Sequence, residues 1–133
     1  MKKIADTGLL AAALDRSDAW HGWGAAQLRQ NAPFYTCDAV LAELAFVIDN
    51  PIPGLKLVAR GDLILDFDLA ANLARVLDLL ERYADRRMEL ADACLVRMTE
   101  LTDACKVWTV DKGDFRVYRR HGRGVIPCEF PKS

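Results

Sequence analysis

Residues Met88–Phe115 read MELADACLVRMTELTDACKVWTVDKGDF, and the fold class follows from them. The pattern predicts a helix over Leu90–Asp103, a tight turn, a buried strand over Val107–Val110 and an acidic loop. Asp92 stands near the start of the helix, and Asp111 directly follows the strand. In a parallel α/β fold, helix starts and strand ends meet at one edge of the sheet, where such folds place their sites. We therefore expect these two carboxylates to lie close together.

Two further acids occupy matching positions in the first half of the chain. Asp6 follows an apolar strand expected over Lys2–Ala5. Glu43 lies in an amphipathic helix expected over Cys37–Asp49, directly after a short strand at Phe34–Thr36. It borders the apolar face of that helix, where an inward carboxylate costs several kcal/mol unless something compensates, although a Glu there can also extend into solvent. The sequence thus predicts four carboxylates at one end of a small domain.

Strands and helices alternate along the whole chain. This alternation favours the α/β class, as a three-layer α/β/α sandwich with a central parallel sheet. The sharpest break, Asn50–Gly54, is interpreted as a loop within a single domain spanning residues 1–133, because neither half could bury a core alone. Two further strands are expected, at Leu63–Phe67 and Val125–Cys128, and helical turns at Leu55–Arg60 and Asp114–Tyr118. Three further helices are expected: one over Leu9–Leu14, one that begins after a cap at Ser17, and one over Leu69–Tyr83. In the last of these, the side chains expected to face inward are those of Leu69, Leu73, Val76, Leu77 and Leu80.

The composition is that of a compact globule, with 52% hydrophobic residues and a net charge of −1. The charge is uneven, because residues 106–133 carry seven Lys or Arg against three Asp or Glu. The four cysteines form no CxxC pair and there are two histidines, which argues against a zinc site or a disulfide framework. No apolar run approaches the roughly 20 residues of a membrane span. We expect a cytoplasmic protein with reduced thiols and no membrane association.

Four carboxylates packed at one sheet edge would repel one another, and some would take up protons near neutral pH. One or two Mg²⁺ or Mn²⁺ ions would remove this repulsion, since both are hard cations that prefer oxygen ligands. Such an ion can activate water and stabilise the leaving oxygen of a phosphoryl displacement. The basic C-terminal part could then hold a phosphodiester over the metal, or it could be a solvated tail. The candidate phosphate contacts are Arg116, Arg119, Arg120 and Arg123, of which Arg116 could instead pair with an acid inside the fold.

Four segments in the expected order resemble the PIN-domain family, and within it the chain is similar to VapC-type toxins. The segments, which span Ile4 to Pro127, are IADTGLLAAALD, TCDAVLAELAFV, MELADACLVRMTEL and VWTVDKGDFRVYRRHGRGVIP. The resemblance implies an α/β/α sandwich and a metal-dependent endoribonuclease that cleaves RNA. It also implies a small antitoxin protein as partner and a homodimer. An apolar antitoxin segment would lie between helices that carry Leu9, Leu10 and Trp23.

Carried onto this sequence, the family pattern assigns roles to seven residues. It implies Asp6, Glu43, Asp92 and Asp111 as the catalytic and metal-binding acids, Asp114 as a further metal candidate, and Thr7 and Thr109 as polar neighbours of the metal. The chain departs from the family at two helix caps. Cys37 replaces the more frequent Ser, and Glu89 stands where a small capping residue is common.

Either Asp111 or Asp114 could be the last ligand of the metal site. Because Asp111 is expected directly past the strand, we predict it to be the metal ligand. Asp114 lies beyond Gly113, and we predict it to cap the following turn, with Asp111→Asn damaging activity and Asp114→Asn having little effect.

Other functions fit single motifs. Asp6-Thr7-Gly8 matches the nucleophilic turn of aspartic proteases, but those are β-rich. Asp66-Phe67-Asp68 resembles the DxD of phosphotransferases and is better explained as a strand end and a helix cap. His21 could be a general base or a structural histidine, and Trp20, Trp23 and Trp108 could stack on bases or pack in the core. The alternative from another class is a PIN-fold RNA- or partner-binding protein with little or no catalysis.

Overall fold

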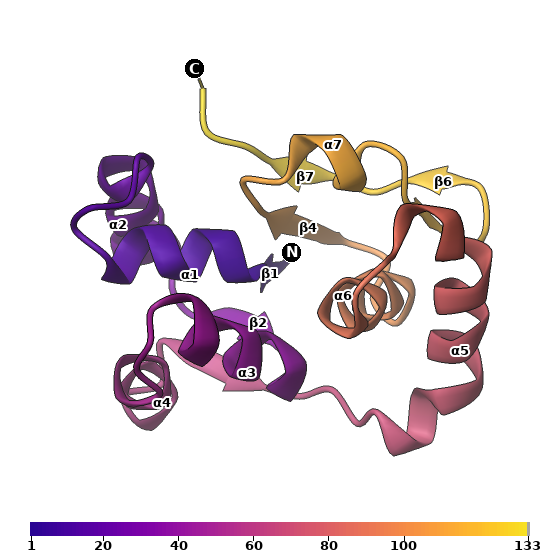
Figure 1. Cartoon of the computed structure of the whole chain (residues 1–133), viewed down its shortest axis with the longest axis horizontal. Coiled ribbons are helices and arrows are strands. Elements are labelled where there is room, and N and C mark those ends of the chain that lie inside the picture. Colours follow the sequence, from indigo (N-terminus) through magenta and orange to yellow (C-terminus); the bar gives the residue numbers. More distant parts are fainter. Residues whose placement is uncertain (133) are drawn as a thin grey trace.

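A computed structural model describes residues 1–132 and contains a five-stranded sheet in the order β3-β2-β1-β4-β7. All four neighbouring pairs in this sheet are parallel, so the carboxyl ends of its strands share one edge. The strands are β1 (Lys2–Ala5), β2 (Phe34–Thr36), β3 (Leu63–Leu65), β4 (Cys105–Trp108) and β7 (Cys128–Glu129). Helices lie around the sheet, which confirms the expected α/β/α sandwich (Figure 1).

The helices occupy the crossover connections between strands (Figure 1). They are α1 (Thr7–Leu14) and α2 (His21–Asn31) before β2, α3 (Asp38–Val47) and α4 (Ile52–Ala59) before β3, and α5 (Leu73–Arg82) and α6 (Leu90–Glu100) before β4. Short 3₁₀ turns, η1 (Ala70–Asn72) and η2 (Ala84–Arg86), flank α5. After β4 come α7 (Lys112–Phe115) and an antiparallel pair, β5 (Arg119–Arg120) and β6 (Gly124–Val125). None of the helices in residues 1–132 has the length and apolar character needed to cross a bilayer.

The central strands are buried as a parallel sheet covered on both faces requires. Ile4 and Val107, neighbours in the register of β1 and β4, are fully inaccessible to solvent. Phe34 of β2 packs edge-on against Trp108 of β4, with ring centroids 5.3 Å apart. Trp108 also donates its indole N–H to Gln27 of α2 at 2.9 Å, so it is a core residue.

Strand β4 ends at Trp108, two residues before the expected end at Val110. Its pairing explains the difference, because the register with β1 ends at Ala5 opposite Trp108. Thr109 still donates its backbone N–H to Glu129 at 3.1 Å, but its side chain turns toward Asp6. The chain therefore leaves the sheet earlier than the apolar pattern predicts, which changes the position of the acids that follow.

Three helix predictions were also wrong in detail. Ser17 does not cap α2, because its N–H and hydroxyl both donate to Asp15 and the helix begins at His21. Helix α4 begins inside the expected loop, where prolines are compatible with a first helical turn. The inward face expected for the helix over Leu69–Tyr83 was partly right, because Val76 is buried and Leu69 and Leu80 pack against the core. Leu73 and Leu77 are about half exposed instead, and Leu79 is buried.

The C-terminal end of α6 is anchored by a buried ionic cluster. The Glu100 side chain is 1% exposed and accepts both Arg75 donors, at 2.7 and 2.8 Å, and the His121 backbone N–H at 2.7 Å. Burial alone would raise the pKa of Glu100, but the partners, which include Arg97, outweigh it and lower the pKa. Arg120 adds hydrogen bonds to the carbonyls of Thr99, Thr102 and Asp103 at the same helix end. This end of α6 is therefore fixed, and the other end reaches the carboxyl edge of the sheet.

Candidate metal centre

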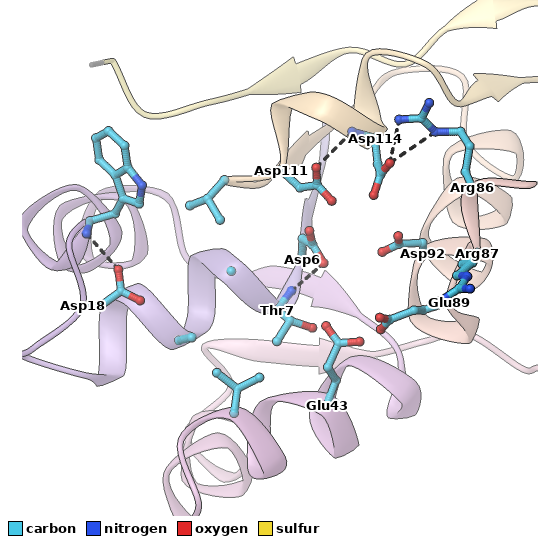
Figure 2. A pocket seen from close by; sticks show the side chains of 15 residues that line it. Asp6, Thr7, Asp18, Glu43, Arg86, Arg87, Glu89, Asp92, Asp111 and Asp114 are labelled. Carbon is cyan, nitrogen blue, oxygen red and sulfur yellow. Dashed lines mark hydrogen bonds and ion pairs between the residues drawn. The ribbon is translucent and has the colours of Figure 1, made fainter. Parts of the chain in front are cut away.

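A pocket of about 520 Å³ lies at the carboxyl edge of the sheet, and its lining is strongly acidic. Five expected acids come together there from four elements: Asp6 after β1, Glu43 on α3, Asp92 on α6, and Asp111 and Asp114 around α7 (Figure 2). The parallel strand order explains this convergence, since β1 and β4 are neighbours and α6 leads into β4.

Asp6 is the most rigidly held carboxylate of the pocket. It is the N-cap of α1, and Oδ1 accepts the Thr7 backbone N–H at 2.7 Å. Its Oδ2 accepts the Thr109 hydroxyl at 2.6 Å. Burial, with smaller contributions from the charges of Glu43 and Asp111, raises the pKa of Asp6 to about 6 against the lowering effect of these two hydrogen bonds.

The hydroxyl groups of the two threonines beside Asp6 differ in their hydrogen bonding. Thr109 is fully buried, and its hydroxyl oxygen also accepts the Asp111 backbone N–H at 3.0 Å. It therefore joins Asp6 to the loop that carries Asp111. The Thr7 hydroxyl is buried too, yet it has no hydrogen-bond partner anywhere in residues 1–132. A buried, unpartnered oxygen beside an acidic pocket is what a ligand or ordered water would satisfy.

Asp92 lies in the first turn of α6, at the end opposite Glu100. Its Oδ2 accepts the hydroxyl of Tyr118 at 2.9 Å. Burial raises the pKa of Asp92 to about 7, with the charge of Asp6 adding to the effect and the Tyr118 hydrogen bond opposing it. Tyr118 is fully buried, and burial together with Asp92 raises the pKa of its phenol. Sequence reasoning missed Tyr118, which lies 26 residues from Asp92 and reads as an ordinary core aromatic.

Glu43 faces another carboxyl group, that of Glu89, across the pocket (Figure 2). Burial is the main cause that raises the pKa of Glu43 to about 7, and the neighbouring carboxyl group of Glu89 contributes to this rise. Glu89 is the N-cap residue of α6 but makes no side-chain capping bond. Its departure from a usual capping residue is thus explained by its position on the pocket wall, which the sequence did not reveal.

The predicted roles of Asp111 and Asp114 in local structure are reversed. Asp111 is the N-cap of α7, and its Oδ1 accepts the Asp114 backbone N–H at 3.0 Å. Asp114 lies inside the short helix and caps nothing; its Oδ1 accepts the guanidinium of Arg86 at 2.8 Å. The early end of β4 causes the exchange, because the turn then begins at Lys112 instead of Phe115. Burial raises the pKa of Asp111.

One oxygen from each of Asp92, Asp111 and Asp114 lies within 4.8 Å of the other two. Asp6 and Glu43 line the same pocket. The donors are all carboxylate oxygens, which is the set that Mg²⁺ and Mn²⁺ prefer. Burial is the main cause of the raised pKa values of four of these acids, and the charges of neighbouring acids add to it. A divalent cation would remove that part of the effect which comes from the neighbouring charges. The residues therefore fit such an ion.

The predicted phosphate contacts do not line this pocket. Arg119 donates to the carbonyls of Arg116, Val117 and Tyr118, and Arg120 is bound at the far end of α6. Arg116 lies over the ring of Phe130, 5.5 Å from its centroid.

A separate hollow on the surface contains Arg123, together with Arg120, His121 and Asp103. The positive charge beside the acids comes instead from Arg86 and Arg87, in the turn before α6. Positive charge is therefore present at the pocket, although in a different segment from the one that the sequence indicated.

Of the other candidate residues from the sequence, Trp20 lines the pocket, whereas His21 and Asp68 are not part of its lining. Trp20, one of the candidate stacking residues, lines the pocket and is half-buried, and Asp18 accepts its backbone N–H at 2.8 Å. His21 lies within 2.8 Å of the Ala12 carbonyl, a hydrogen bond that joins α2 to α1. It is a structural histidine. Asp68 accepts the Ala71 N–H, which supports a cap at the Asp66-Phe67-Asp68 motif.

No protein-family model matches the chain, and no curated protein matches it by sequence. A solved structure does match: the Mycobacterium tuberculosis toxin VapC20, described as cleaving the sarcin–ricin loop. The two superpose with a TM-score of 0.76 and 19% sequence identity, over 95% of this chain and 100% of the toxin. A likeness over both whole chains establishes the fold, which is the PIN-like α/β/α sandwich expected from the sequence.

Proposed function

We propose that this PIN-fold chain is a metal-dependent endoribonuclease and the toxin of a type II toxin–antitoxin pair. The observation that carries the proposal is the convergence of Asp6, Glu43, Asp92, Asp111 and Asp114 in one pocket. The fold likeness to an RNA-cleaving toxin supports RNA as the substrate class. The whole chain acts as one domain in this proposal, because the acids come from both its halves.

Asp92, Asp111 and Asp114 would hold a first Mg²⁺ or Mn²⁺ ion, with Asp6 and Glu43 completing the site. When bound, such an ion lowers the pKa of water and stabilises a leaving oxygen. The chain itself supplies fixed geometry and a proton acceptor.

Thr109 and the Thr7 N–H prevent the Asp6 carboxylate from rotating, and Tyr118 holds one oxygen of Asp92. In the metal-free pocket the pKa of Glu43 is about 7, so Glu43 can serve as the proton acceptor near neutral pH as long as it does not itself bind the cation.

The deciding experiment measures RNA cleavage with Mg²⁺, with Mn²⁺ and with chelator. Wild type is compared with Asp6→Asn and with Asp68→Asn, a matched loss of one carboxylate outside the pocket. We expect chelator and Asp6→Asn each to abolish cleavage, and Asp68→Asn to leave it intact. Cleavage that survives both treatments would show a contaminating nuclease or a mechanism without metal. Binding of RNA without cleavage in every condition would favour the alternative, a PIN-fold binding protein.

A small antitoxin should cover an apolar surface near the acids. Of the expected docking residues, Leu9 and Leu10 are fully buried and cannot form that surface, and Trp23 is half-buried and packs against the core. Val47, at the end of α3, lines the pocket and is exposed. Its neighbours in the sequence include three further exposed apolar side chains: Phe46 of α3, which is 87% exposed, and Ile52 and Leu55 of α4. We propose that the antitoxin covers this face and places a basic side chain at the acidic pocket.

Copurification of the natively expressed protein tests the partner, and its mass in solution tests the expected homodimer. Phe46→Ser should release the antitoxin, whereas a protein with Leu101→Ser, a change at an apolar residue after α6 that is 51% exposed, should retain it. A protein that is always isolated alone would contradict the partner. We place this activity in the cytoplasm, where RNA is present and the four unpaired cysteines stay reduced.

A further inference from the structure

Arg86 holds the carboxylate that a metal ion would need. Its Nη2 and Nε donate to Asp114 Oδ1 at 2.8 and 3.3 Å. Arg86 Nη2 also lies 3.5 Å from the Gly113 carbonyl. Figure 2 shows the guanidinium extending toward Asp114 from the wall that carries Asp92. Asp114 thus has two kinds of neighbour: the positively charged guanidinium of Arg86, and the carboxylate oxygens of Asp92 and Asp111.

The turn that carries Arg86 is built to keep it there. Arg87 adopts a left-handed conformation, with φ 55° and ψ 46°, which lets the chain reverse before α6. Its N–H bonds to the Ala84 carbonyl at 2.9 Å. On either side, the chain is anchored by two buried residues, Met88 and Tyr83, and the Tyr83 hydroxyl accepts the Arg119 N–H at 3.0 Å. The position of Arg86 therefore follows from a fixed turn.

The ion pair itself is easy to open. The side chains of Arg86 and Asp114 are 40% and 34% exposed, and part-exposed pairs are weak. Arg87 lines the same pocket, and no hydrogen bond or ion pair within residues 1–132 occupies its guanidinium. A guanidinium binds phosphate as well as carboxylate, because its planar fork of donors fits both.

We propose that Arg86 exchanges partners. In the metal-free protein it neutralises Asp114; when a divalent cation binds at Asp92, Asp111 and Asp114, Arg86 is released and contacts an RNA phosphate together with Arg87. The buried Thr7 hydroxyl without a partner is the independent sign that this pocket takes a ligand. The RNA half of the exchange rests on the proposed function, whereas the metal half does not.

The exchange predicts that one substitution, Arg86→Gln, raises the affinity for Mn²⁺ and lowers the affinity for RNA. Arg86→Gln removes a competing cation, so the Mn²⁺ affinity of the RNA-free protein should rise by about two- to fivefold, the range for a part-exposed ion pair. Binding is followed by the paramagnetic signal of free Mn²⁺ or by calorimetry. Arg116→Gln removes the same charge outside the pocket and is the matched control. A substitution that merely damaged the turn would lower the affinity instead.

RNA binding is measured with a fluorescent single-stranded RNA at saturating Mn²⁺, in an Asp6→Asn background that keeps Asp92, Asp111 and Asp114 and leaves the RNA intact. Arg86→Gln and Arg87→Gln should each weaken binding and lower the slope of log affinity against log salt by about one phosphate contact. Arg116→Gln should leave both unchanged. If Arg86→Gln weakens Mn²⁺ and RNA binding together, or alters neither, the exchange is wrong.

A double substitution separates the two proposals. In Asp114→Asn the partner of Arg86 is absent, so adding Arg86→Gln should no longer raise the Mn²⁺ affinity. If Arg86→Gln still raises the Mn²⁺ affinity of the Asp114→Asn protein by the full amount, the rise does not come from the Arg86–Asp114 pair. This result would overturn the exchange and leave the nuclease proposal intact. Wild type that binds no Mn²⁺ would overturn both. Wild type that binds Mn²⁺ but no RNA would overturn the nuclease proposal and the RNA half of the exchange.

Discussion

The charge on Asp6 should destabilise the metal-free protein, and Asp6→Asn should reveal it. The pKa of Asp6 is about 6 in the fold, against an ordinary value of 3.8. The folded protein therefore retains the proton over a range in which the unfolded chain has lost it, so stability falls as pH rises from about 4 to about 6. A difference of about two pKa units corresponds to a loss of about 3 kcal/mol, which is complete above pH 6.

Asn at position 6 removes this loss but gives up part of the hydrogen bonding. It can still accept the Thr7 N–H, whereas the bond with the Thr109 hydroxyl is weakened, at about 1 kcal/mol. In chelator, the variant should therefore be more stable than wild type by about 2 kcal/mol at pH 7.5 and less stable by about 1 kcal/mol at pH 4.

Urea denaturation at both pH values, with chelator present, measures the two differences. Added Mn²⁺ should stabilise wild type more than the variant at pH 7.5, since the variant lacks one of the proposed ligands. A variant that is less stable by the same amount at both pH values would refute the reasoning, because Asp6 would then act only as a helix cap.

Three further predictions concern neighbouring groups. Asp111→Asn and Asp114→Asn should each lower Mn²⁺ affinity by calorimetry, with Asp111→Asn keeping its melting temperature because Asn is an equally good cap; unchanged affinity in either would remove that acid from the site. Tyr118→Phe should raise the pKa of Asp92, which moves the acidic limb of the pH–rate profile upward, and an unmoved limb would deny that contact a role. Glu100→Gln breaks a buried ion pair remote from the pocket, so it should lower the free energy of unfolding, measured in urea, by roughly 3 kcal/mol and leave kcat near wild type. A large loss of kcat under conditions in which the variant is fully folded would contradict this.

The sequence predicted the sheet and the convergence of acids because both depend on local signals. Asp6 follows a four-residue strand, and Asp92 lies in the first turn of a helix that precedes another strand. Parallel α/β topology then places such residues at one edge. No distant contact was needed for that inference.

What the sequence could not provide depends on contacts between distant segments. The end of β4 is set by its pairing with β1 and β7, and this pairing decides whether Asp111 or Asp114 caps the next turn. Similarly, Arg120 looked free for phosphate because its carbonyl partner at Asp103 lies 17 residues earlier. The basic composition of the C-terminal part was real, but composition does not tell which guanidinium groups are already bound.

Local errors have the same origin. Leu73 and Leu77 fit a helical apolar stripe as well as Val76 and Leu79 do, and only the packing of α5 against α6 selects between the two faces. The contact of Glu43 with Glu89 joins segments 46 positions apart in the chain, and no periodicity announces it.

Helix α6 is held firmly at Glu100 and strained by charge at Asp92, and this asymmetry predicts how the resting protein fluctuates. Without a cation, amide hydrogens in the first turn of α6 should exchange with solvent faster than they do with a cation bound, because opening that turn separates repelling acids while the far end stays closed. The pocket would then disassemble and reform many times within the lifetime of one folded molecule. A cation would slow exchange only in the first turn, so the protein can lose the arrangement of its acidic pocket without losing its fold.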